Sequence, residues 1–204
     1  DNGETTLTGW EIVASKGISS KKDTTDENGY YEFSFDAIEV GTWTISESNQ
    51  TGWVQTLPGN NGDYSIAIVS RIDTQNVNFG NFQAASISGY KYYDRNGNGI
   101  WDQPQESGLL GWEIIATKNA VVKKETTDVN GYYSFSNLTA GNYTLSEEQQ
   151  TGWSQTFPAS PGTYTVDLLD ADSLLNYDFG NRAVHTIVAS AEENGSITPS
   201  GNVL

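Results

Sequence analysis

Apolar and polar residues alternate along this chain in many short runs, and this alternation is typical of β-strands that bury one face. Residues 143–147 (Tyr-Thr-Leu-Ser-Glu), 164–168 (Tyr-Thr-Val-Asp-Leu) and 175–179 (Leu-Asn-Tyr-Asp-Phe) all follow it. By contrast, no run of about ten residues has the period of an amphipathic helix. We therefore predict strands over these three segments and an all-β fold for the chain.

Asn-Gly pairs mark turns between these runs. Asn28-Gly29 and Asn130-Gly131 each lie between segments rich in β-forming residues. This dipeptide is the strongest short-range signal for a hairpin, so we expect a hairpin at each pair. About seven short strands in a hundred residues is the strand density of a β-sandwich. The pattern therefore predicts sandwich domains.

The same pattern occurs twice, so the chain contains two copies of one unit. Residues 9–12 (Gly-Trp-Glu-Ile) return at 111–114, and residues 24–31 return at 126–133 with a single change, both 102 positions later. Later landmarks such as Thr-Gly-Trp and Phe-Gly-Asn recur after 100 positions, so the first copy carries two extra residues. A repeat of about a hundred residues predicts two tandem domains.

The repeat also sets the expected domain limits. We predict a first domain over residues 1–83, a second over 84–184, and a remainder, 185–204, that begins a further surface repeat or acts as a donor strand. Residues 86–106 have no counterpart in the first copy apart from Glu4, so the first domain is expected to lack its first strand. Either the chain is cut from a longer array, or a partner supplies the strand and head-to-tail donation builds filaments.

Composition and charge narrow the chemistry. The 204 residues include 10 Lys and Arg against 26 Asp and Glu, a net charge of -16, which repels nucleic-acid backbones. There is no cysteine, and His185 is the single histidine, so thiol catalysis and most acid–base schemes lack their residues. No apolar run approaches the roughly 18 residues of a membrane span. We expect a non-enzymatic protein without a membrane span in this segment.

Residues 94–102 have the spacing of the front half of a calcium-binding loop. Oxygen-bearing side chains stand at alternate positions, and Gly99 at the sixth position permits the sharp turn. The last acid lies one residue beyond the position that an EF-hand uses, and the alternative is a solvated Asn/Gly-rich turn. We predict Ca²⁺ at modest affinity, ~10⁻⁴–10⁻³ M. The predicted ligands are Asp94, Asn96, Asn98, the carbonyl group of Ile100, Asp102 and Glu106.

Three further polar residues fall on the inward faces of their predicted strands. Lys91, Glu147 and Asn181 each continue an apolar alternation toward the core. Burying an unpaired Lys or Glu is unfavourable, so they either meet inside the domain, form an ordinary buried ion pair, or turn to solvent at the strand ends. The first copy keeps Glu47 and Asn81 but has no matching lysine.

Several segments, in order along the chain, resemble a known family. Residues 89–109, 126–133, 141–147, 151–153 and 178–181 are similar to SdrD B-type repeats, which belong with the Cna B-type, prealbumin-like modules of microbial surface proteins. The resemblance implies two tandem prealbumin-like (Ig-like) β-sandwich domains. It also implies a secreted, cell-surface stalk or adhesin whose partners are neighbouring modules of the same protein.

The resemblance gives the inward polar residues a possible chemistry. Cna B-type domains use a Lys, a Glu and an Asn to form a spontaneous isopeptide bond, and Lys91, Glu147 and Asn181 match those residue types. A rival function, carbohydrate binding, depends on the tryptophans at matched repeat positions. If exposed and coplanar, they form a binding platform, and if buried, they pack the cores. These residues are Trp10, Trp53, Trp112 and Trp153.

Overall fold

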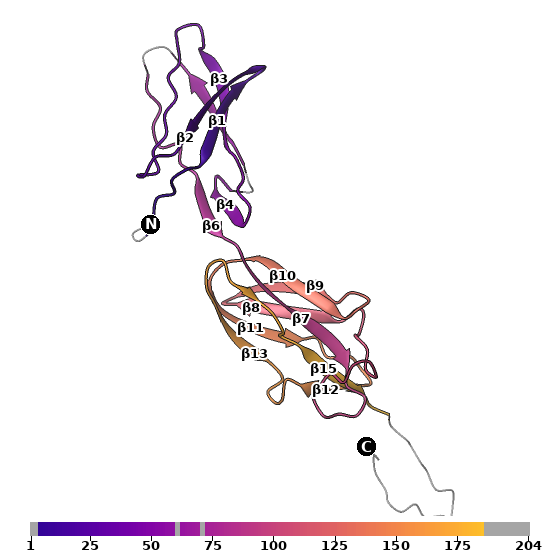
Figure 1. Ribbon diagram of the computed structural model, residues 1–204. Helices are drawn as coiled ribbons and strands as arrows, with labels where there is room; N and C mark the ends of the chain where they lie inside the picture. Colours follow the sequence, from indigo (N-terminus) through magenta and orange to yellow (C-terminus); the bar gives the residue numbers. More distant parts are fainter. Residues whose placement is uncertain (1–3, 60–61, 70–71, 186–204) are drawn as a thin grey trace, which may run out of the picture. The chain divides into compact units, whose positions relative to one another are not determined.

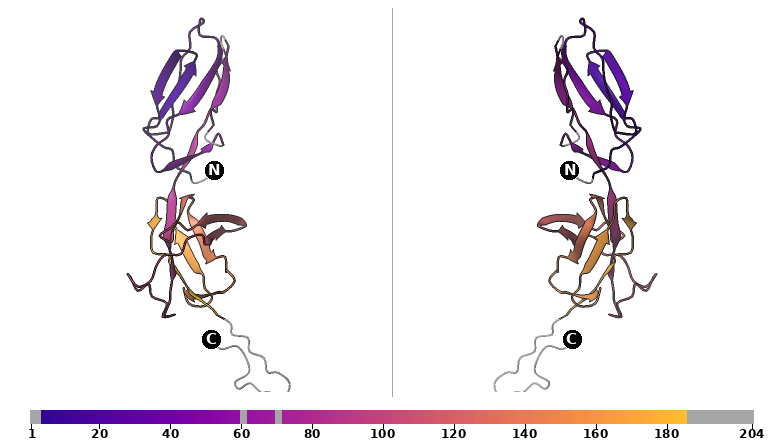
Figure 2. Two further views of the ribbon diagram at one scale, coloured as in Figure 1. Left: turned by 90° about the vertical axis from the view of Figure 1, so that its right-hand side faces the viewer. Right: turned by 90° about the vertical axis from the view of Figure 1, so that its left-hand side faces the viewer.

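The computed structural model describes residues 4–59, 62–69 and 72–185, and every regular element within them is a β-strand (Figures 1 and 2). The chain divides into two compact units, unit 1 (Asp1–Ala84) and unit 2 (Ala85–Leu204). Each is built from β-sheets that pack around an apolar core, so the prediction of tandem all-β sandwiches is confirmed. The described residues contain no helix with the length and hydrophobicity needed to cross a membrane.

Unit 2 has two sheets over its described residues. One has the strand order β13-β11-β8-β9, and the other has the order β10-β7-β15-β12, with the short β14 paired to β7. The strands are β7 (Ala85–Tyr93), β8 (Glu113–Lys118), β9 (Val121–Thr126), β10 (Tyr132–Leu138), β11 (Gly141–Glu147), β12 (Trp153–Phe157), β13 (Tyr164–Leu168), β14 (Ser173–Leu174) and β15 (Phe179–Ala183).

Strand β7 is the central strand of its sheet. It pairs antiparallel with β10, where Tyr133 faces Gly89, and parallel with β15, where Phe179 faces Lys91. The first and last described strands of unit 2 are therefore hydrogen-bonded neighbours that run in the same direction (Figure 1). The core between the sheets consists of side chains that are at most 5% exposed, among them Ile87 of β7 and Leu145 of β11.

Two of the strand predictions are confirmed and one is wrong in part. Strand β13 matches the predicted 164–168, and β11 contains the predicted 143–147. The third segment fails because β14 ends at Leu174 and β15 begins only at Phe179. Between them, Asn176 has a left-handed φ of 67°, which interrupts an extended strand. Residues 175–178 are therefore a connection, although their side chains alternate like a strand.

The predicted hairpin at Asn130-Gly131 is also wrong. The turn joins β9 of one sheet to β10 of the other, so the two strands do not pair with each other. Asp128 closes the turn, because its carboxylate accepts hydrogen bonds from the backbone N–H groups of Asn130 and Tyr132. An Asn-Gly pair specifies a tight reversal of the chain, and the choice between a hairpin and a crossing between sheets depends on distant pairing.

Unit 1 has a similar arrangement of strands, but the counterparts of β7, β10 and β14 are absent from its described residues. Its four-stranded sheet has the order β2-β1-β3-β5, and a two-stranded ladder joins β4 to β6. No described residues stand where β7 stands in unit 2, and residues 30–36, the counterpart of β10, form no strand. The strands are β1 (Glu11–Lys16), β2 (Ser19–Thr24), β3 (Gly41–Glu47), β4 (Trp53–Leu57), β5 (Tyr64–Ile68) and β6 (Gly80–Gln83).

The backbone of β7 comes close to Gly131, whereas Gly111, which has the same φ, has no atom near the position of its missing Cβ. Gly131 and Gly111 both have a φ of 79°, but only at Gly131 would a Cβ atom lie 2.1 Å from the carbonyl oxygen of Lys91. We expect Gly111→Ala to lower the free energy of unfolding of unit 2 by about 1–2 kcal/mol, the strain of a left-handed alanine. Gly131→Ala should lower it by more than about 3 kcal/mol, because β7 must move. Denaturant unfolding of both variants tests this, and equal losses would contradict the packing argument.

Candidate functional site

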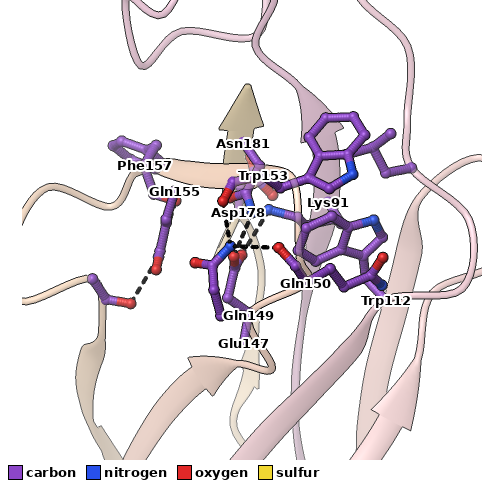
Figure 3. Close-up of polar contacts among 12 residues, drawn as sticks. Lys91, Trp112, Glu147, Gln149, Gln150, Trp153, Gln155, Phe157, Asp178 and Asn181 are labelled. Carbon is purple, nitrogen blue, oxygen red and sulfur yellow. Dashed lines mark hydrogen bonds and ion pairs between the residues drawn. The ribbon is translucent and has the colours of Figure 1, made fainter. Parts of the chain in front are cut away.

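Lys91, Glu147 and Asn181 meet inside unit 2 (Figure 3). Lys91 lies on β7, Glu147 is the last residue of β11 in the facing sheet, and Asn181 lies on β15 beside β7. The Lys91 Nζ is 2.6 Å from Glu147 Oε2, and the Asn181 Nδ2 donates a hydrogen bond of 2.6 Å to Glu147 Oε1. The side chains of the ion pair are 0% and 1% exposed, so the contact is closed to water.

Burial moves both members of the ion pair toward their neutral forms. It lowers the pKa of Lys91 to about 8, although the attraction of Glu147 opposes the shift. It also raises the pKa of Glu147, with Lys91 and Asn181 opposing. Both shifts reduce the free energy needed to move the proton from the amine to the carboxylate, a transfer that would leave a neutral, nucleophilic amine beside a carboxylic acid.

Two tryptophans close the site on one side. The Lys91 Nζ lies 4.3 Å from the ring centroid of Trp112, a cation–π distance, and Trp153 meets Trp112 edge-on at 5.6 Å. Figure 3 shows both indoles beside the lysine. Residue spacing alone does not predict this role, and the available signal is the recurrence of tryptophan at the matched positions Trp10 and Trp53 of unit 1.

The carboxamide oxygen of Asn181 has no hydrogen-bond partner in the described structure. The Nδ2 of the same group donates to Glu147, but Oδ1 is buried and unpaired. A buried carbonyl oxygen left unpaired is unfavourable by about 1–3 kcal/mol. Glu147 thus holds the amine of Lys91 with one oxygen and the carboxamide of Asn181 with the other.

Unit 1 has the same site without the amine. The Asn81 Nδ2 donates a hydrogen bond of 2.9 Å to Glu47 Oε2, as in unit 2. The other oxygen, Glu47 Oε1, is buried and has no partner among the described residues. Burial raises the pKa of Glu47, and the Asn81 hydrogen bond opposes the rise. Among the residues that the structure describes, no lysine or arginine pairs with this partly buried carboxylate.

The predicted calcium loop is held together by hydrogen bonds from its own backbone. Asp94 is fully buried, and its carboxylate accepts the N–H groups of Gly97, Asn98 and Gly99. The amide nitrogens of Asn96 and Asn98 both donate to one oxygen, Asp102 Oδ2, at 2.8 and 2.9 Å. Three of the predicted ligand side chains, Asn96, Asn98 and Asp102, therefore converge on one point.

The other predicted ligands lie differently. Glu106 is 5% exposed, and its two oxygens accept the backbone N–H groups of Arg95 and Asp102, so it braces both ends of the loop. The side chain of Ile100 is exposed, and its N–H donates to Asn98 Oδ1. Within residues 4–59, 62–69 and 72–185, no three His, Cys, Asp or Glu side chains are grouped so as to hold a metal ion.

The loop nevertheless fits a calcium ion in its donor chemistry. Rotating an asparagine amide exchanges an N–H donor for an oxygen of nearly the same shape. Turning Asn96 and Asn98 in this way would direct their oxygens toward Asp102, at the loss of the backbone bonds that these oxygens now accept. Amide, carboxylate and carbonyl oxygens are the ligands that Ca²⁺ prefers.

The repeat-matched tryptophans do not form a coplanar exposed platform. Trp10 and Trp112 are 4% and 2% exposed. Trp53 and Trp153 are half-buried and meet them edge-on, with interplanar angles of 89° and 87°. This geometry is that of core packing and gives no support to carbohydrate stacking at these four residues.

Comparison with known proteins identifies relatives over most of the chain. The profile of the SdrD B-like domain matches residues 85–197. Serine-aspartate repeat-containing protein C of Staphylococcus aureus (strain N315) is 30% identical over 171 residues, which cover 78% of this chain and 17% of that protein. Serine-aspartate repeat-containing protein F of Staphylococcus epidermidis is 27% identical over 170 residues, covering 76% of this chain and 10% of that protein. The chain thus spans less than a fifth of these relatives.

Among solved structures, the chain is similar to GBS52, the minor pilin of Streptococcus agalactiae. The sequence identity is 12% and the TM-score is 0.38. The match covers 92% of this chain and 88% of the pilin.

The same substitution should act with opposite sign in the two units. Glu147→Gln leaves the buried Lys91 charge uncompensated, and we expect unit 2 to lose about 3–5 kcal/mol of stability. Glu47→Gln removes a carboxyl group whose folded pKa is raised, so the folded state no longer has to hold a buried, unpaired charge. Unit 1 should therefore become more stable at neutral pH.

The pH dependence separates this effect from simple repacking. A raised folded pKa means that the stability is fully present below the ordinary glutamate pKa of 4.5 and is lost as the pH rises through the folded value. Glu47→Gln should therefore match the parent chain at pH 4 and exceed it at pH 7. Hydrogen exchange of β3 and β11, followed by mass spectrometry, reports on the two units separately. Destabilisation of both units at pH 7 would contradict the prediction.

Proposed function

Because the chain belongs to the family of SdrD B-like domains, we propose that it is a structural segment of an extracellular, cell-surface protein, in which each unit is a spacer between neighbouring modules. The relatives are named for their repeats, and the chain itself carries two copies of one sandwich. We propose no enzymatic role. The chain has no cysteine, and its single histidine, His185, is exposed.

The observation that carries this proposal is the parallel pairing of β7 with β15. A spacer transmits tension between the two ends of its chain, and in unit 2 these ends lead into adjacent strands of one sheet. Tension on two parallel neighbours loads all of their hydrogen bonds in shear at once, whereas tension on an antiparallel hairpin opens its bonds one at a time. This arrangement favours resistance to force over binding or catalysis.

We further propose that Lys91 and Asn181 become joined by an isopeptide bond. The neutral Lys91 Nζ attacks Asn181 Cγ, a C–N bond forms, and Nδ2 leaves as ammonia. Glu147 takes the proton from the amine and returns it to the leaving nitrogen, since it contacts both groups. The burial and the lowered pKa of Lys91 support this step. The product would tie the first strand of unit 2 to its last strand covalently.

We also propose that Ca²⁺ stabilises the loop that follows β7. Asn96, Asn98 and Asp102 would hold the ion through their side-chain oxygens, with the carbonyl group of Ile100, while Asp94 and Glu106 shape the loop. A bound cation would replace the amide N–H groups that now surround Asp102 and would fix the loop between β7 and residues 107–110. The convergence of the three side chains supports this role.

If the isopeptide bond forms, it should lower the mass of unit 2 and shorten the length to which the chain extends under force. Unit 2 should weigh about 17 Da less than its sequence, because ammonia is lost, and Lys91→Met or Glu147→Gln should abolish the deficit. In force spectroscopy, the bond would keep the 89 residues between positions 91 and 181 from extending. The parent chain should therefore extend by about 300 Å less than Lys91→Met. An unmodified mass in folded protein would show that the isopeptide bond does not form. The spacer role would then depend on the parallel pairing of β7 and β15 alone, and the unfolding force of the parent chain tests it.

If the loop binds Ca²⁺, the unfolding temperature of unit 2 should rise with calcium, and the rise should depend on the carboxylate of Asp102. Ca²⁺ at about ten times its dissociation constant should raise the unfolding temperature of unit 2 by about 5 °C or more, because it binds only the folded loop. Asp102→Asn should remove this rise with little change in the calcium-free midpoint. Asp170→Asn carries the same charge change at an exposed position and should keep the rise. A midpoint that calcium leaves unchanged contradicts the proposal.

A further inference from the structure

Unit 2 has a cavity of about 450 Å³ that is lined in part by Tyr90 of β7. Because neighbouring residues of a strand point to opposite faces, Tyr90 lies on the other face of the sheet from the buried Lys91. The remaining walls come from the loop that follows β7 and from the turn before β10. Small-molecule sites typically have volumes of about 300–1,000 Å³, so this cavity is large enough for a ligand.

Two aromatic side chains, Tyr90 and Trp101, form part of the cavity wall. Trp101 stacks on Tyr92 with an interplanar angle of 11°, and its indole N–H donates to the carbonyl oxygen of Glu106. Tyr90 lies 5.2 Å from Trp101 and 5.3 Å from its cross-strand neighbour Tyr132, measured between ring centroids. Tyr90 and Trp101 are held by these contacts but are only half-buried, so they present a fixed apolar surface to the cavity.

The walls of the cavity are also tied to one another through the backbone. The N–H of Tyr93 in β7 donates to the carbonyl oxygen of Ser107 at the end of the loop. The next residue, Gly108, packs so closely against the turn that a Cβ atom there would overlap the carbonyl oxygen of Asn130. The cavity is therefore preformed, and a preformed site loses little conformational entropy when a ligand binds.

Three polar side chains complete the lining: Gln103, Ser107 and Asn130. All three residues are exposed, and their side-chain amide and hydroxyl groups make no hydrogen bond within the part of the chain that the structure describes. Amides and hydroxyls can both donate and accept hydrogen bonds. These groups therefore suit a ligand that also carries donors and acceptors together.

The cavity carries no charge of its own. No acidic or basic side chain is among the described residues that line it, although the chain contains 26 Asp and Glu and 10 Lys and Arg. A charged ligand would lose hydration there without gaining an opposite charge, and the net charge of -16 repels anions in particular. The lining therefore selects a neutral ligand.

We propose that this cavity binds a neutral saccharide whose pyranose rings carry equatorial substituents, as in β-1,4-linked glucose and N-acetylglucosamine. Equatorial substituents leave the C–H faces of the ring flat and apolar, and one such face would pack on Tyr90 and Trp101. The hydroxyl groups around the ring would bind Gln103, Ser107 and Asn130. This role goes beyond that of a spacer and requires neither the isopeptide bond nor calcium.

A proline-rich peptide is the other class of ligand that aromatic grooves recognise. A polyproline segment offers carbonyl acceptors but no backbone N–H donors. It could accept hydrogen bonds from the amide N–H groups of the cavity, but it would leave the amide oxygens unpaired. A saccharide hydroxyl satisfies donors and acceptors alike, so the polar lining favours the sugar.

Isothermal titration calorimetry of the full chain with cellohexaose and with chitohexaose tests the proposal. We expect saturable one-to-one binding of at least one of them. Tyr90→Leu should weaken it at least about tenfold, because the apolar surface is lost, and Gln103→Ala should act in the same direction. The matched controls Tyr132→Leu and Gln105→Ala change neighbouring residues that do not line the cavity, and they should keep the parent affinity. Thermal unfolding checks that each variant is folded.

Hydrogen exchange with saturating sugar shows where the ligand binds, and protection should appear at residues 101–108 and 128–131. Absence of saturable binding of both sugars overturns the proposal, as does binding that survives Tyr90→Leu and Gln103→Ala. If Tyr90→Leu does not fold, Gln103→Ala, at an exposed position, decides alone. Saturable binding of decaproline at the same residues in place of the sugars would make the ligand a peptide and overturn the proposal as well. The unfolding force tests the spacer role separately, so either role can fail without the other.

Discussion

The burial of one positive charge constrains the rest of unit 2. Lys91 is 0% exposed, and an amine in that position is tolerated only where an acid compensates it. Glu147 provides this compensation from the facing sheet, so the ion pair couples the two layers. Lys91 lies on the central strand β7, and its position therefore also sets the pairing of β10 and β15 on either side.

The two units form an internal comparison, since one has a strand of the β7 type and the other lacks it in the described structure. Twelve residues form the buried cluster of unit 2, but only four are fully buried in the cluster of unit 1, where eight more are partly exposed. The hydrogen bond between asparagine and glutamate survives in both. The acid and the amide are thus placed by β3 and β6 alone, whereas the closure of the core and the compensation of charge depend on the central strand.

Strict alternation located β11, β13 and the inward direction of Lys91, Glu147 and Asn181, because burial on one face of a strand is a local property of the sequence. Local sequence patterns led to wrong predictions where the structure depends on pairing between strands far apart in the sequence. Residues 175–178 alternate without a partner strand, and Asn130-Gly131 turns between sheets. The predicted calcium loop shows a third limit: residue spacing predicted six oxygen ligands, whereas in the described structure the carboxylates of Asp94 and Glu106 accept backbone N–H groups. Whether an oxygen faces the backbone or an ion depends on loop geometry that residue spacing does not encode.

A buried ion pair is a poor choice for stability alone, because apolar residues of equal volume would often serve as well. In a tandem array, the advantage of such an ion pair is that it fixes the register in which the strands pair. Slipping β7 by one residue would turn Lys91 to the outer face and leave Glu147 uncompensated, which is far more unfavourable than exchanging one aliphatic contact for another. In a protein built from similar repeats, the charge therefore distinguishes the correct strand, in the correct register, from the many β-prone segments nearby. In unit 1 the matching carboxylate, Glu47, keeps its hydrogen bond to Asn81, and its other oxygen has no partner among the described residues.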